Sequence, residues 1–93
     1  MSVPQQHYNE LYELLAAIDS PSEAKNLLED ILTPQELDSL TERWQLVRLL
    51  DAGVSQREIA KKLNVSISKI TRGSRVMQYG SGGFRHFLEK LKK

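Results

Sequence analysis

The chain has 93 residues, no cysteine and a formal net charge of +1 at pH 7. This length accommodates one small domain, residues 1–93, and the missing thiols exclude disulfides, thiolate zinc sites and a cysteine nucleophile. No apolar run approaches the ~20 residues that span a bilayer. Because the sequence also starts without a signal-peptide pattern, we expect a cytoplasmic protein with no membrane partner.

Two helices are predicted in the first third of the chain. Apolar residues recur at spacings of three and four over Gln6–Ile18, which is the pattern of an amphipathic helix. Ser20 then acts as the N-cap of a second helix over Pro21–Ile31, with proline at the first helical position. Both helices carry wide apolar stripes, as do the third and the last, and a lone chain of this length would be marginally stable. We therefore expect an obligate homodimer that shares its core.

A capping box begins the third and longest helix. In Thr33-Pro34-Gln35-Glu36, the hydroxyl and the carboxylate are spaced for reciprocal bonds to backbone N–H groups. The helix is predicted to end at Gly53. Its predicted apolar stripe consists of Leu37, Leu40, Trp44, Val47 and Leu50.

Two short helices follow, joined by a tight turn. Ser55-Gln56-Arg57-Glu58 is a second capping box, and the helix that it begins ends at Asn64, a residue that tolerates the left-handed conformation. Ala60 is small where the next helix must cross closely, and Val65 and Ile70 fill the space between the two helices. This pattern is typical of a helix-turn-helix, whose second helix lies in the DNA major groove.

The charge distribution supports DNA binding by this motif, which covers about residues 55–77. Residues 1–42 carry nine acids and one base, whereas residues 43–93 carry twelve bases and three acids, so the balance is −8 against +9. The exposed positions of the second helix carry hydroxyls and cations that suit base edges and phosphates. These are Ser68, Lys69, Thr71, Arg72 and Arg75.

Two other interpretations fit the same residues. One is an ordinary helical hairpin with a solvated basic face, and the other is a helical adaptor whose basic half binds an acidic protein. DNA binding through several cations weakens steeply with salt and depends on the DNA sequence, whereas an adaptor shows no operator preference.

Glycines at positions 80, 82 and 83 separate the motif from a last amphipathic helix, which carries Phe84, Phe87, Leu88 and Leu91. No segment predicts a strand. The expected fold is therefore all-α, with six helices.

Catalytic and metal-binding patterns are missing from the sequence. His7 and His86 lie at opposite ends of the chain, and neither has an acid or hydroxyl at a motif spacing. Gly80-Ser81-Gly82-Gly83 lacks the lysine and hydroxyl residue that end a phosphate-binding loop. We expect no enzyme, no metal site and no cofactor.

Three motifs, taken in order, resemble the Trp repressor family: LTPQE at residues 32–36, SQRE at 55–58 and ITRGS at 70–74. Trp repressor is itself a standard example of the helix-turn-helix. The resemblance covers nearly the whole chain. It implies an intertwined homodimer of six-helix chains that represses transcription from operator DNA when L-tryptophan binds as co-repressor beside each recognition helix.

The resemblance also implies roles for single residues. Arg43 and Arg72 match the two arginines that flank the ligand, and a guanidinium can pair with its carboxylate. Gly73 matches the glycine that lets the ligand approach the backbone, and Leu32 and Thr33 match a turn of the partner chain that closes the pocket. The matching DNA-contact positions are Gln56, Arg57, Ile67, Ser68 and Thr71.

The chain departs from the family pattern at several positions. The tryptophan-binding members have a serine near the ligand's ammonium where this chain has Val76, and an apolar residue where it has Asp30, an alternative acceptor. Ala60 replaces a lysine that contacts DNA, and the link before SQRE is one residue shorter. Two alternatives stay open: a tryptophan-responsive repressor, and a related DNA-binding regulator with a different ligand or none.

Overall fold

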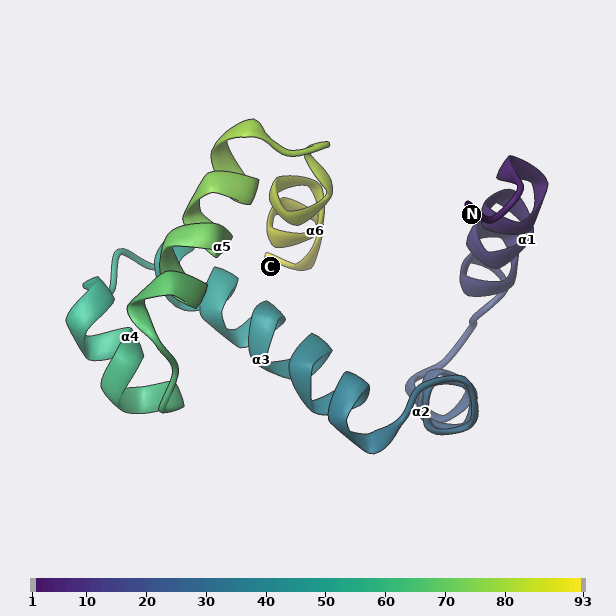
Figure 1. The fold of residues 1–93 in the computed structure, drawn as a ribbon, viewed down its shortest axis with the longest axis horizontal. Coiled ribbons are helices and arrows are strands. Elements are labelled where there is room, and N and C mark those ends of the chain that lie inside the picture. Colours follow the sequence, from purple (N-terminus) through teal and green to yellow (C-terminus); the bar gives the residue numbers. More distant parts are fainter. Residues whose placement is uncertain (1, 93) are drawn as a thin grey trace. The chain divides into compact units, whose positions relative to one another are not determined.

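The computed structural model describes residues 2–92, which form six α-helices and no strand (Figure 1). The helices are α1 (Gln5–Ala16), α2 (Pro21–Ile31), α3 (Pro34–Asp51), α4 (Gln56–Leu63), α5 (Ile67–Tyr79) and α6 (Gly83–Leu91). The predicted all-α fold is therefore confirmed. Among the described residues, no helix has the length and apolar composition needed to cross a membrane.

The chain divides into two compact units. Unit 1 extends to Leu37 and contains α1, α2 and the start of α3, and unit 2 extends from Asp38 onward. The expected single domain over residues 1–93 stays a prediction.

Hydrogen bonds between residues close in sequence define the helix ends of unit 1. The Ser20 hydroxyl accepts a bond from the Glu23 N–H at 3.1 Å, and the Glu23 carboxylate accepts one from the Asp19 N–H at 2.9 Å. The predicted end of the first helix at Ile18 is wrong, because α1 ends at Ala16 and the Ile18 N–H bonds only three residues back, to the carbonyl oxygen of Leu15. Such a tightened last turn is a common way to satisfy helix-end groups.

The apolar stripe of α1 is not covered within unit 1. Neither α1 nor α2 contains a buried residue. The large apolar side chains of α1 are between 38% and 58% exposed, which is unusual for an amphipathic helix whose stripe faces a core. They are Tyr8, Leu11, Tyr12, Leu14 and Leu15.

The capping box at the start of α3 forms as predicted. The Thr33 N–H donates to the Glu36 carboxylate at 2.8 Å, and the Glu36 N–H donates to the Thr33 hydroxyl at 3.1 Å. The hydrogen bonds of the Glu36 carboxylate with the backbone N–H and with the side chain of Thr33 lower the pKa of Glu36.

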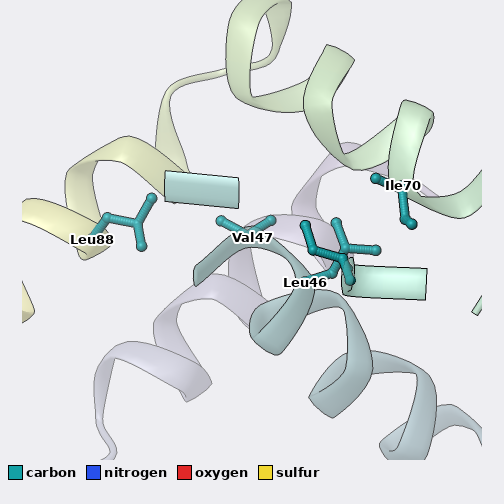
Figure 2. Packing of buried hydrophobic residues seen from close by; sticks show 5 residues of the cluster. Leu46, Val47, Ile70 and Leu88 are labelled. Carbon is teal, nitrogen blue, oxygen red and sulfur yellow. The ribbon is translucent and has the colours of Figure 1, made fainter. Parts of the chain in front are cut away.

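Unit 2 has a hydrophobic core contributed by all four of its helices. Leu46 and Val47 from α3, Ile70 from α5 and Leu88 from α6 are labelled in Figure 2, and Ile59 from α4 completes the set. Ile59 and Ile70 have no exposed surface, so the two motif helices pack directly on this core.

The predicted stripe of α3 is only partly correct. Val47 is buried as expected, but Leu40 is 42% exposed and Leu46, which lies off the stripe, is 4% exposed. The reason is that α3 in unit 2 is covered on two sides. Leu46 contacts α5 at Gly73, whereas Trp44 faces Phe84 of α6 with ring centroids 6.3 Å apart.

Candidate nucleic-acid interface and ligand cavity

The turn between α4 and α5 has the geometry of a helix-turn-helix. Asn64 is in the left-handed conformation, with φ of 53°, and it is the C-cap of α4. The Val65 N–H bonds to the Ala60 carbonyl oxygen at 3.2 Å, which closes the turn. Ser66 caps α5 by accepting a bond from the Lys69 N–H at 3.3 Å. The predicted motif is confirmed as a local structure.

The outer side of α5 presents an open groove of hydroxyls, cations and small apolar groups. Ser68 and Thr71 are exposed there, and Ile67 is 51% exposed although it is apolar. Exposed hydroxyls and methyl groups on a recognition helix suit base edges and the thymine methyl. The groove is lined by Ile67, Ser68, Thr71, Arg72, Arg75 and Val76. Most of the predicted DNA contacts are therefore gathered on one surface.

Gln56 and Arg57 are exposed in the first turn of α4. The Ser55 hydroxyl caps this turn by accepting a bond from the Glu58 N–H at 3.2 Å. Gln56 and Arg57 thus lie at the start of the first motif helix, where a helix-turn-helix contacts the DNA backbone or a neighbouring base.

Lys69 differs from the other predicted DNA contacts. Its ammonium forms an ion pair with the Glu42 carboxylate of α3 at 3.0 Å, and it does not line the outer groove. The side chain of Lys69 is instead part of the wall of a cavity on the inner side of α5.

This cavity, of about 250 Å³, lies between α3 and α5, with Phe84 of α6 in its wall. It contains three of the predicted ligand-binding residues, Arg43, Arg72 and Gly73. Neither arginine forms an ion pair with another residue in the described part of the chain. The volume lies below the about 300–1,000 Å³ of drug-sized sites, so the cavity suits a ligand as small as an amino acid.

Gly73 has a packing role in addition to its place in the cavity wall. A Cβ atom at this position would collide with Cδ2 of Leu46 and would come within 3.8 Å of Leu50. The glycine therefore allows the close approach of α5 to α3, on which the shape of the cavity depends.

The predicted partner-chain residues belong to unit 1. Leu32 is the half-buried C-cap of α2, and Thr33 is the exposed cap of α3. Asp30 is exposed near the end of α2. Their part in a ligand pocket stays a prediction.

Sequence reasoning did not assign six residues of the cavity wall to a ligand site: Ser39, Glu42, Leu46, Val47, Lys69 and Phe84. Ser39, Glu42 and Leu46 follow one another at spacings of three and four along α3, and Ser39 and Leu46 lie four and three residues from Arg43, so these side chains share one face of the helix. That helical spacing was the signal that could have found them.

The histidines have no site around them. His86 packs edge-on against the Phe87 ring, with centroids 5.0 Å apart, and His7 is exposed. Within residues 2–92, no group of three or more histidine or acidic side chains is arranged to hold a metal ion.

The turn at Asn64 and the exposed hydroxyls and cations of α5 make this all-α chain a helix-turn-helix protein. Comparison with known families assigns it further, because the model of the Trp repressor protein family matches residues 6–92. The chain belongs to the Trp repressor family, whose members are DNA-binding regulators of transcription and not enzymes. Family membership favours DNA binding over the adaptor interpretation.

Individual relatives agree with this assignment. A Trp operon repressor homolog of Xylella fastidiosa is 40% identical over 87 residues, which cover 92% of each chain. The homolog of Mannheimia succiniciproducens is 35% identical over 91% of this chain and 85% of its own. Among solved structures, a TrpR like protein from Eubacterium eligens has a TM-score of 0.88 at 28% identity and covers 92% of this chain and 89% of its own.

Proposed function

We propose that this chain is a homodimeric repressor of transcription in the cytoplasm, and that an amino acid bound between α3 and α5 strengthens its binding to operator DNA. L-tryptophan is the first candidate, since the relatives are named Trp operon repressor homologs. Target genes for tryptophan synthesis or uptake would follow from that ligand.

One observation carries the proposal: Arg43 on α3 and Arg72 on α5 line the same cavity. A carboxylate held between two guanidinium groups forms strong, charge-assisted hydrogen bonds. Because the two arginines belong to different helices, such a ligand would hold the recognition helix at one angle to unit 2's core. The gain in DNA affinity can be no larger than the ligand's preference for that angle over others.

The DNA-binding surface in this proposal consists of the outer side of α5 and the first turn of α4. Arg72 is shared between the outer groove and the cavity. A ligand that positions Arg72 therefore acts directly on a residue of the DNA surface.

The homodimer in this proposal follows from unit 1. Its apolar side chains are half-exposed and none in α1 or α2 is buried, so a second copy is the simplest surface to cover them. Dimers of helix-turn-helix proteins bind half-sites about one helical turn apart on DNA. A folded monomer at micromolar concentration in sedimentation equilibrium would contradict the dimer.

A regulator with a ligand other than tryptophan is the second candidate. It is favoured by Val76, which lines the cavity where the tryptophan-binding members have a serine. Calorimetric titration with each of the twenty standard amino acids separates the two candidates.

Arg43→Ala is the sharpest variant for the proposal. Arg43 lines the cavity but not the outer groove, so the variant is expected to bind DNA normally and to lose its response to the ligand. The loss corresponds to a coupling of about 1–3 kcal/mol, or about 5- to 150-fold in DNA affinity. The DNA is a duplex selected in vitro from random sequences. A full response to tryptophan in Arg43→Ala would exclude the cavity as the site.

A further inference from the structure

The wall of the α3–α5 cavity contains an ion pair that joins its two helices. Lys69 Nζ lies 3.0 Å from Glu42 Oε1, and both residues line the cavity. Glu42 is the only acidic residue among the described residues of this wall, which also holds the cations of Arg43, Lys69 and Arg72. The cavity therefore offers two free guanidinium groups for an anion, and one carboxylate that is already engaged.

This ion pair is weakly held. The side chains of Lys69 and Glu42 are 61% and 32% exposed, and exposed pairs contribute little net stability because water and salt screen them. A second cation that enters the cavity can therefore replace the ammonium of Lys69 at the Glu42 carboxylate with little loss of stability. The ammonium of a ligand whose carboxylate pairs with Arg43 and Arg72 replaces Lys69 more readily than a free cation does, because it is already held close to Glu42.

The position of Lys69 in the sequence gives this exchange a consequence. Lys69 is the third residue of the recognition helix α5, directly after Ser68 of the outer groove. When its ammonium is paired with Glu42, its charge is compensated within unit 2. When it is released, the same flexible side chain adds a cation to the first turn of the helix that meets DNA, where lysines bind phosphate.

We propose that Glu42 recognises the cationic group of the ligand, and that Lys69 occupies this place while the cavity is empty. Binding of an amino acid with a free ammonium then releases Lys69 to a DNA phosphate. The inference rests on the proposed function, in that a ligand carboxylate binds at Arg43 and Arg72. It adds the class of ligand, a zwitterion with its ammonium unmodified, and a cause for the rise in DNA affinity.

The first experiment needs no ligand. Glu42→Gln keeps the shape of the side chain but removes the negative charge that pairs with Lys69, and DNA affinity is measured as a function of salt by fluorescence anisotropy. We expect the slope of log K against log [salt] to steepen by about one, which corresponds to one additional phosphate contact. Adding Lys69→Gln to this variant is expected to restore the slope of the wild type. Glu89→Gln is the matched control, because it breaks an exposed ion pair with Lys92 outside the cavity.

The second experiment tests the recognition of the ammonium. Calorimetry compares L-tryptophan with its deaminated analogue, 3-(indol-3-yl)propanoate, on the wild type, Glu42→Gln and Glu89→Gln. We expect the wild type to prefer tryptophan about tenfold, as for one charge-assisted hydrogen bond in a partly exposed site, and Glu42→Gln to lose the preference. Circular dichroism confirms that each variant is folded.

The outcomes separate the inference from the proposed function. An unchanged salt slope in Glu42→Gln, or an unchanged preference for tryptophan, overturns the inference even if tryptophan binds. No binding of any of the twenty amino acids to the wild type contradicts the proposed function, and the salt slope then decides on its own whether Glu42 withholds Lys69 from DNA.

Discussion

Units 1 and 2 are built from helices of the same kind, yet they differ in what those helices bury. In unit 1, hydroxyl and carboxylate caps define the starts of α2 and α3 but not that of α1, and α1 and α2 have no buried side chain. In unit 2, four helices enclose five buried apolar residues, and α3 is covered on two sides by α5 and α6. Caps and apolar spacing thus define where a helix begins and which of its faces is apolar, but a core forms only where other helices cross that face.

The comparison also has a functional side. The cavity and the outer groove both belong to unit 2, where α5 contributes Ile70 to the core and exposes its outer side. Unit 1 offers an apolar surface that a second copy of the chain is expected to complete. The following changes break or sharpen this contrast, from the largest expected effect to the smallest.

Ile59→Ala removes a core side chain with no exposed surface. We expect the free energy of unfolding to fall by about 2–4 kcal/mol, from lost apolar burial and the cavity left behind. Urea denaturation measures it. Ile67→Ala is the control, because Ile67 is 51% exposed and its loss should change stability by less than about 0.5 kcal/mol. Equal losses in both variants would contradict the placement of Ile59, and not Ile67, in the core of unit 2.

Leu15→Ala tests the uncovered stripe of unit 1. Leu15 is 41% exposed in the single chain, so the change should have little effect on the stability of a monomer. The free energy of unfolding of a dimer that buries Leu15 should fall by about 2 kcal/mol. Thermal unfolding at two protein concentrations measures the effect, with Glu13→Ala on the same helix as control. An unfolding temperature that depends on neither concentration nor Leu15 would show that no second copy covers α1.

Arg57→Ala tests the exposed first turn of α4 in unit 2. We expect a loss of about 1–3 kcal/mol in binding to the selected DNA duplex if Arg57 contacts a base. Competition with duplexes altered at single positions shows whether specificity is relaxed at one of them. Arg48→Ala, on α3 and outside both the groove and the cavity, should bind normally. A loss that is equal for all sequences would make Arg57 a phosphate contact, and no loss would remove it from the DNA surface.

The smallest expected effect is a pH dependence that originates in unit 1. The Thr33 backbone N–H and hydroxyl hold the pKa of Glu36 below its ordinary value of 4.5 in the folded chain. The resulting stabilisation is therefore complete above 4.5 and is lost as the pH falls through the lowered folded value. Urea denaturation between about pH 7 and pH 3 should show a shallower decline for Glu36→Gln than for the wild type. An identical decline in both, with Glu10→Gln as control, would contradict the capping role of Glu36.

Much of the local structure could be predicted from the sequence. The N-caps of α2 and α4, the capping box of α3 and the left-handed Asn64 each depend on neighbours within four residues, so their chemistry can be read along the chain. The helix-turn-helix followed from the same signals, because a small residue, a turn residue and two apolar residues define how α4 and α5 cross. Arg43, Arg72 and Gly73 came from resemblance, and the structure brings all three to one cavity.

What the tertiary structure alone decided is how each helix face is used. Leu40 and Leu46 are both leucines of α3, but Leu46 is buried against α5 and Leu40 is exposed, because burial depends on which helix crosses at that level. Lys69 is an exposed cation of α5 like Arg72 and Arg75. Its ammonium nevertheless pairs with the Glu42 carboxylate, 27 positions away, so its side chain lies in the cavity wall. Local hydrogen bonds and helical periodicity are properties of a short segment, whereas burial and ion pairing between helices depend on the path of the whole chain through space.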